Sequence, residues 1–468
     1  MSGIRFAAAV ALVALSIGAG PAQRGSSHLF SSSDVLAFRL TAPFNQLFAT
    51  ADDDSNLAVT GTVTYGPAGR ETNIEGVKVS LRGHTSREGR ECTFPKLKLQ
   101  IPADHLAADS PFAGTSVVKI GTHCGESSDD TITAEYGRLP NERAAHREAF
   151  VYRLLDIFGV ATLEARPARI SYIYADARPS QTPDQRQPIV RDAFLLEDTD
   201  EAVKRLGGKS QVGEDTFTNA RDRFAPSDTA TVTFAEAMLG NFDWCLRMTP
   251  QDTYRCNGRH PLWNVLAVVD ASGRARPLIY DFDVTGMVAG GHRWFADVYN
   301  EAFLPSHSHP AIEVLGQIER TRSLFGRGDL NAVRARFMEK KSAAYAALAA
   351  AAIDPAGKRR IQEYLDGFFD AIGSDEAFYR PVVVARGSMP YATASRSDVV
   401  CTDKGAIPVG TVVTDALQQT NRMIQVVVLD SLWHWGPPTK CAAIHAGAVW
   451  IDSNTVSRDY PPEGNSSR

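Results

Sequence analysis

The sequence has 468 residues, of which 44% are hydrophobic and 22% are charged. This is ordinary for a globular protein and long enough for about two or three domains. The formal net charge of -5 excludes the strongly basic field that non-specific nucleic-acid binding requires, so nucleic acid is not an expected partner.

The N-terminal segment has the pattern of a signal peptide. Arg5 precedes an apolar run from Phe6 to Ile17, and small residues follow as far as Ala22. We expect residues 1–22 to be removed on export and the mature protein to be secreted or periplasmic. No later stretch has the roughly 18 uninterrupted apolar residues of a membrane span, so no transmembrane segment is expected after cleavage.

Six cysteines, an even number in a chain with an export signal, favour disulfides. No CxxC pair occurs, which argues against a zinc site. Six cysteines allow 15 connectivities. Closeness in sequence favours the pairs Cys92 with Cys124, Cys245 with Cys256, and Cys401 with Cys441.

Short β-runs separated by turns fill much of the first 200 residues. Strands are predicted over residues 57–65, 77–82, 97–101, 116–121, 168–174 and 187–197, the last two as a long hairpin. Apolar residues at helical spacing predict a helix over residues 141–158, which ends at Gly159.

Helical patterns dominate the next part of the chain. They cover residues 200–206, 231–239, 311–324, 329–352 and 357–372. A β-rich part followed by a helical part predicts an α+β arrangement with a cleft between the two. Short strands return after Tyr379, over residues 398–401, 410–413, 423–430 and 448–451, and predict a separate small β-barrel.

Polar side chains accompany two apolar β-runs between Gly240 and Gly286. They are Asn241, Asp243, Asn264, Asp281 and Asp283. Phosphoryl transfer needs a carboxylate to orient or deprotonate the acceptor hydroxyl, and an Asn and an Asp to hold a divalent metal against the phosphates. N-x-D or D-x-D alone is common in turns. Their joint order favours a metal-phosphate site, where a cation would relieve repulsion between Asp281 and Asp283.

This order of motifs resembles the CotH family of spore-coat kinases and the wider group of atypical protein-kinase-like folds. The matching positions in the acidic region are Gly240, Asn241, Asp243, Trp244, Asn264, Tyr280, Asp281, Asp283 and Gly286. The resemblance also takes in LRGHTS at residues 81–86, the strand PKLKLQI and the helix REAFVYRLLDIFGV. It spans roughly residues 77–286.

The resemblance implies a bilobal kinase-like domain over residues 23–378. Its β-rich N-lobe is expected over about 35–197 and its helical C-lobe over about 198–378. The implied cofactor is Mg or Mn with ATP. The implied roles are Asp243 as catalytic base, Asn264 and Asp281 as metal ligands, and Asp283 as an assisting ligand.

A kinase also needs a cation on the nucleotide phosphates, oriented by an acid on a neighbouring helix. The resemblance favours Lys98, with Lys119 as the alternative and Glu148 as the helical acid. Each of these three is at least as readily a solvated surface charge.

Departures from the family leave the function open. The chain has no HRD and no GxGxxG, and a cysteine-containing insertion separates Asp243 from Asn264. We expect an extracytoplasmic kinase that transfers a phosphoryl group from a metal-nucleotide to a protein hydroxyl. The alternatives are a noncatalytic pseudokinase that binds the envelope or surface, and a metal-dependent phosphohydrolase.

Residues 379–462 resemble bacterial SH3-like (SH3b) modules through the segments MPYATAS, IPVGTVV and GAVWIDSNTV. The resemblance implies a cell-wall ligand, with Trp433 and Trp435 as the aromatic platform. An accessory barrel without a ligand is equally compatible. Residues 463–468 are expected to be a disordered tail.

Overall fold

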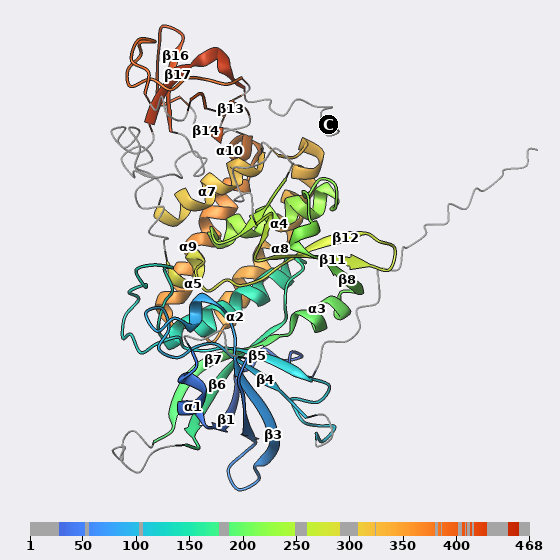
Figure 1. Cartoon of the computed structure of the whole chain (residues 1–468). Helices are drawn as coiled ribbons and strands as arrows, with labels where there is room; N and C mark the ends of the chain where they lie inside the picture. Colours follow the sequence, from blue (N-terminus) through green and yellow to red (C-terminus); the bar gives the residue numbers. More distant parts are fainter. Residues whose placement is uncertain are drawn as a thin grey trace, which may run out of the picture.

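The computed structural model describes residues 28–51, 56–102, 106–176, 187–248, 260–290, 308–322 and 324–379. In the C-terminal part it describes 382–384, 386–400, 405–407, 409, 412–413, 416–427 and 448–457. The chain is a mixed α+β protein with a strand-rich N-terminal part and a helical middle (Figure 1). Within these residues, no helix combines the length and apolar character needed to cross a membrane.

Seven N-terminal strands close into a barrel in the order β1-β2-β3-β4-β5-β7-β6. Their bounds are β1 (Leu36–Ala42), β2 (Ala58–Tyr65), β3 (Thr72–Leu81), β4 (Leu97–Gln100), β5 (Val117–Gly121), β6 (Ala165–Tyr174) and β7 (Ile189–Glu197). Neighbours are antiparallel except β1 and β6, whose parallel pairing closes the barrel. The strands after β1 were predicted, but closure was not, because it joins segments far apart in the sequence. A closed barrel is also not a clear match for the expected N-lobe.

Alternation along β7 links the barrel to the rest of the molecule. Ala193 and Leu195 point into the barrel core, whereas Phe194 and Leu196 belong to the core of the helical part. Side chains alternate between the two faces of a strand, so a strand buried on both sides reads as a continuous apolar run. The barrel and the helical part therefore share this strand.

Helix α2 (Glu142–Ile157) lies between the barrel and the helices of the middle of the chain (Figure 1). The side chain of Asn141 caps its start by accepting a hydrogen bond from the backbone N–H of Arg143. The helix packs on β6 and β7 on one side and contacts α5 (Gly286–Ala289) and α8 (Arg327–Ala350) on the other. Side chains of α2 can therefore contact both the barrel and the helical part of the molecule.

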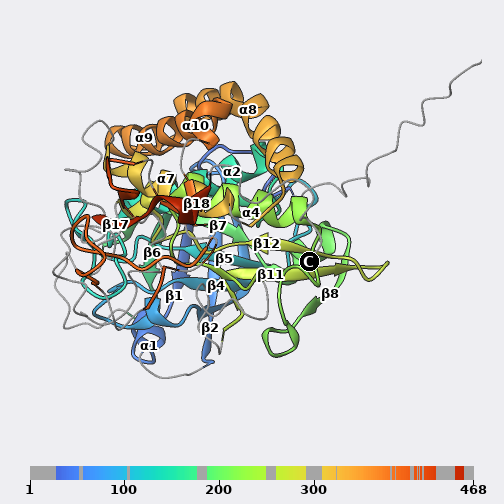
Figure 2. The same ribbon diagram turned by 90° about the horizontal axis from the view of Figure 1, so that it is seen from above.

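The remaining helices are α1 (Phe44–Phe48), α3 (Thr199–Arg205), α4 (Pro226–Leu239), α5 (Gly286–Ala289), α7 (His309–Arg322), α8 (Arg327–Ala350), α9 (Pro355–Ile372) and α10 (Asp375–Tyr379). Seen from above, α8, α9 and α10 lie along one edge of the molecule, and α1 lies at the opposite edge (Figure 2). Two small sheets accompany them, in the orders β12-β11-β8 and β10-β9. Their strands are β8 (Gly208–Val212), β9 (Cys245–Leu246), β10 (Leu262–Trp263), β11 (Val265–Asp270) and β12 (Ala275–Ile279).

The described C-terminal residues after α10 form two three-stranded sheets, β14-β13-β18 and β15-β16-β17. The bounds are β13 (Val382–Val384), β14 (Val412–Val413), β15 (Gln418–Thr420), β16 (Met423–Val427), β17 (Ala448–Asp452) and β18 (Val456–Ser457). Ile407, Val426 and Ile451 belong to their shared core. The SH3-like identity stays a prediction, and Trp433 and Trp435 lie outside the described residues.

The predicted disulfide between Cys92 and Cys124 is confirmed. Cys245 is also disulfide-bonded, and its predicted partner Cys256 lies outside the described residues. The predicted pair of Cys401 and Cys441 lies outside them as well, as does the expected signal peptide.

Candidate functional site

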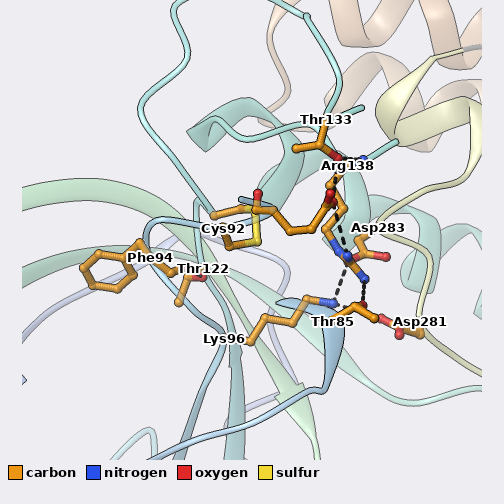
Figure 3. Close-up of a disulfide and its surroundings, with 11 residues drawn as sticks. Thr85, Cys92, Phe94, Lys96, Thr122, Thr133, Arg138, Asp281 and Asp283 are labelled. Atoms are coloured by element: carbon orange, nitrogen blue, oxygen red, sulfur yellow. Dashed lines mark hydrogen bonds and ion pairs between the residues drawn. A yellow bond between two sulfur atoms is a disulfide. The ribbon is translucent and has the colours of Figure 1, made fainter. Parts of the chain in front are cut away.

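Lys96, directly before β4, bridges the two aspartates of the D-x-D motif (Figure 3). Its Nζ lies 3.0 Å from Asp281 Oδ1 and 2.8 Å from Asp283 Oδ2. Burial opposes the positive charge of Lys96, but the two carboxylates outweigh it and raise the pKa of the lysine. We call Asp281 and Asp283 the acidic pair.

The backbone bends sharply where the acidic pair begins. Strand β12 ends at Ile279, and Asp281 has a φ of 66°, which a regular strand does not contain. The N–H of Asp281 donates to the Tyr152 hydroxyl of α2 at 3.1 Å, and Phe282 packs its ring on Tyr152. The acidic pair is thus placed by a turn anchored on α2, not by strand alternation.

Asn264 and Asp243 form a second pair beside it. The Asn264 side-chain amide donates to the backbone oxygen of Asp243 at 2.6 Å and to Asp243 Oδ2 at 3.1 Å. Trp263 Nε1 donates to the other carboxylate oxygen at 3.0 Å. Asn264 also has a positive φ, 54°, a conformation that Asn tolerates better than most residues and that is frequent at functional sites.

The two pairs lie next to each other. The N–H of Tyr280 donates to the backbone oxygen of Asn264 at 3.1 Å. This hydrogen bond joins the residue before Asp281 to Asn264, the partner of Asp243. Burial, together with the charges of Asp281 and Asp283, raises the pKa of Asp243 to about 7. The motifs that are separate in sequence therefore meet in one region.

Two glycines hold the loops of these motifs together. The N–H of Gly286 donates to the backbone oxygen of Gly240 at 3.1 Å, and both backbones pack on the ring of Tyr364. Gly240 has a φ of 60° at the end of α4, and a Cβ there would lie 2.3 Å from the ring. Only glycine fits this position without displacing Tyr364.

We expect Gly240→Ala to destabilise the protein by about 2–3 kcal/mol, because it combines a left-handed backbone with a clash against a buried ring. Gly159→Ala is the matched control: Gly159 has a φ of 68°, but no atom lies within 4 Å of its added Cβ. Its cost should be about 1 kcal/mol. Urea unfolding of the two variants measures the difference, and equal losses would contradict the packing argument.

Glu236 on α4 is linked to the Asp243 loop by hydrogen bonds through Asn241. Its Oε2 accepts from the Asn241 side chain at 2.8 Å, and Asn241 Oδ1 in turn accepts from the N–H of Asp243 at 2.9 Å. Burial raises the pKa of Glu236 to about 8. Burial therefore favours the protonated, neutral form of the glutamate in the folded protein.

This predicts a pH-dependent contribution to stability. The pKa of Glu236 in the folded protein lies above its ordinary value of 4.5. Protonated Glu236 therefore contributes fully to the free energy of unfolding below pH 4.5, and this contribution is lost as the pH rises to about 8. Glu236→Gln, which stays neutral, should match the wild type near pH 4.5 and be more stable than it at pH 8. Denaturant unfolding at both pH values tests this, and a constant difference between the proteins would refute it.

Arg138 is a site residue that the sequence reasoning missed. It lies in the irregular segment between β5 and α2, and its Nε donates to Asp283 Oδ2 at 2.8 Å (Figure 3). Its Nη2 donates to Thr85 Oγ1 at 2.7 Å, and its Nη1 lies 3.5 Å from Glu91 Oε2. Two buried cations, Lys96 and Arg138, thus meet the same oxygen of Asp283.

Within the described residues, neither of the two lysines favoured by the sequence forms an ion pair with the acidic pair. Lys98 and Lys119 face each other across β4 and β5. Lys119 lies 3.6 Å from Asp198, and burial, with the nearby Arg82, lowers its pKa to about 8. Of the three lysines, it is Lys96 that contacts the acidic pair. The preference for Lys98 is not supported by this geometry, because Lys98 lies two residues further along the strand.

Glu148 of α2 is buried, and burial raises its pKa to about 8 although nearby Lys96 opposes the rise. Within the described residues, Lys96 forms its ion pairs with the acidic pair and none with Glu148. Lys98 and Lys119, the lysines expected from the sequence, form no ion pair with Glu148 within the described residues either; Lys119 pairs with Asp198.

The acidic pair and Asn264 are the candidate ligands of the magnesium or manganese ion expected from the sequence. Asp283 Oδ1 is buried without a hydrogen-bond partner. Among the described residues, no three His, Cys, Asp or Glu side chains are gathered so that they could hold a metal by themselves. Mg²⁺ is commonly held by one or two carboxylates together with substrate phosphates. The acidic pair could supply the carboxylates, and Asn264 an amide oxygen.

Comparison with known proteins does not assign the chain to a family. No protein-family model and no curated protein matches it. A crystal structure of the Helicobacter pylori proinflammatory kinase CtkA matches with 10% identity and a TM-score of 0.33, over 60% of this chain and 94% of that one. A match this weak establishes neither the fold nor the function of the chain, and the resemblance to CotH stays a prediction.

Proposed function

We propose that the chain is an extracytoplasmic phosphotransferase of kinase-like fold that transfers the terminal phosphoryl group of a metal-nucleotide to a protein hydroxyl. The observation that carries the proposal is the meeting of Lys96, the acidic pair and the Asp243–Asn264 pair in one region. Phosphoryl transfer relies on positioning and charge stabilisation, and these groups supply a cation, metal-binding oxygens and a base.

Asp243 has the properties of the base. Burial raises its pKa above the ordinary value of an aspartate, and a general base works best when its pKa lies near the working pH. Trp263 and Asn264 each donate to one of its oxygens, which fixes the orientation of the carboxylate. In this proposal Asp243 accepts the proton of the acceptor hydroxyl.

Asn264, Asp281 and Asp283 would hold the Mg²⁺ or Mn²⁺ that accompanies ATP. The metal would neutralise charge on the phosphates. In this proposal Lys96 contacts the phosphates, in preference to Lys98 and Lys119, because of the three lysines it is the one paired with the acidic pair. The exported location, the protein acceptor and a cell-wall ligand for the SH3-like module are parts of the proposal that rest on the sequence.

Transfer of label from γ-labelled ATP with Mn²⁺ tests the proposal, with the chain itself and dephosphorylated casein as acceptors. Asp243→Asn should lower the rate by about 10²–10⁴-fold. Asp366→Asn, on α9, is the matched control and should not change it, since Asp366 contacts Tyr345 rather than the site.

The other outcomes separate the alternatives. Release of inorganic phosphate without labelled protein would indicate a phosphohydrolase. Nucleotide binding without either reaction would indicate a pseudokinase. Absence of nucleotide binding would overturn the proposal.

A further inference from the structure

We infer that Arg138 is a positioning residue that aims Asp283 at the metal-nucleotide; this rests on the proposed function. Arg138 itself has no role in the proton or phosphoryl transfer. It acts through Asp283, whose carboxylate it holds by one oxygen. The inference follows from how the two oxygens of Asp283 are used.

The two cations of the site share one oxygen of Asp283. Arg138 Nε and Lys96 Nζ both lie 2.8 Å from Oδ2. The other oxygen, Oδ1, is buried and has no partner. Since an unpartnered buried carboxylate oxygen is costly, it marks the place where a ligand cation would be bound.

The guanidinium of Arg138 is itself fixed from three directions. Thr85 Oγ1 accepts from Nη2, Glu91 Oε2 lies beside Nη1, and the group stands 5.5 Å from the ring centre of Tyr136. Arg138 is only 8% exposed. A planar guanidinium can donate to Asp283 and Thr85 in fixed directions while its Nη1 pairs with Glu91 by charge, without a hydrogen bond; a lysine has one nitrogen and cannot do both.

The anchor of Arg138 is covalently braced. Glu91 also accepts from Thr133 Oγ1 at 2.6 Å and directly precedes Cys92, which is bonded to Cys124 (Figure 3). Lys96 follows four residues later on the same segment. The disulfide therefore constrains the segment that carries Lys96 and the acid that holds Arg138.

Groups that orient a metal ligand commonly change metal affinity by about 10–100-fold when they are removed. Arg138→Lys keeps the charge but loses the directed hydrogen bonds. We therefore expect the Mn²⁺ concentration that gives half of the thermal stabilisation, at saturating ADP, to rise by about 10–100-fold. Thr85→Val, which removes one hydrogen bond from Arg138 and no charge, should shift it less, in the same direction.

Arg205→Lys is the matched control. Arg205 is a largely buried arginine with Glu197 as its partner at 2.8 Å, and it contacts neither member of the acidic pair. It should lower the melting temperature without ligand but leave the Mn²⁺ midpoint unchanged.

A Mn²⁺ midpoint in Arg138→Lys and Thr85→Val equal to that of the wild type would overturn the inference and leave the proposed function standing. An equal rise in Arg205→Lys would also overturn it, because the effect would then reflect general destabilisation. A wild-type chain that is not stabilised by Mn²⁺ and ADP at all would overturn the proposed function, and this inference with it.

Discussion

Lys96→Met should lower the free energy of unfolding by about 3 kcal/mol and abolish stabilisation by nucleotide. Removal of one partner from a buried ion pair leaves the other charge uncompensated, which typically costs 3–5 kcal/mol. Here the substitution leaves the acidic pair with Arg138 as its remaining cation. The loss is measured by denaturant unfolding, and the ligand effect by melting with Mn²⁺ and ADP.

Lys98→Met is the control for this variant. Lys98 lies on the same face of the strand segment but forms no ion pair with the described residues, so the change should stay within about 0.5 kcal/mol. Adding Asp283→Asn to Lys96→Met should recover part of the loss, because it removes a buried negative charge. A loss in Lys98→Met as large as in Lys96→Met would contradict the assignment of Lys96.

The second large effect is expected at Arg147, a fully buried arginine of α2. Its Nε and Nη2 each donate to an oxygen of Asp354 at 2.9 Å, and its Nη1 donates to Asp130 at 3.1 Å. Nη1 also donates to the backbone oxygen of Val288, near the end of α5. Arg147 therefore ties α2 to the start of α9 and to the segment that follows the acidic pair.

Arg147→Met should cost about 3–5 kcal/mol, since Asp354 loses both of its hydrogen bonds from the guanidinium. Arg143→Met is the control: Arg143 lies on the same helix and pairs with the same Asp130 at 3.4 Å, but about a third of its side chain is exposed. Its loss should be below about 1 kcal/mol. Chemical denaturation of both variants measures the two losses of free energy of unfolding. Comparable losses would show that the burial of Arg147 does not determine its contribution to stability.

Much of the fold followed from local patterns. The helix over residues 141–158 was predicted nearly to its bounds because its cap, its apolar spacing and its terminal glycine all lie within one segment. Closure of the barrel by β1 and β6 was not predicted, because no local pattern specifies which distant strands pair. The short strand β9 was not predicted, since two residues carry no periodicity.

The polar residues of the site were predicted from the order of their motifs. Asp243 follows helix α4 and the acidic pair follows strand β12, and the ends of these elements lie close together in the fold. The lysine was harder to choose. Alternation places Lys96 and Lys98 on one face, and only the three-dimensional position of the acidic pair distinguishes them. Arg138 had no sequence signal, because it lies in an irregular segment and its side chain pairs with residues that are far away in the sequence.

Calorimetric titration of the wild type with a nonhydrolysable ATP analogue and Mn²⁺ tests the central claim most directly. We predict binding at one site, retained in Lys98→Met and lost in both Lys96→Met and Asp281→Asn. Absence of binding heat in the wild type, or binding that survives Asp281→Asn unchanged, would contradict a metal-nucleotide site at the acidic pair.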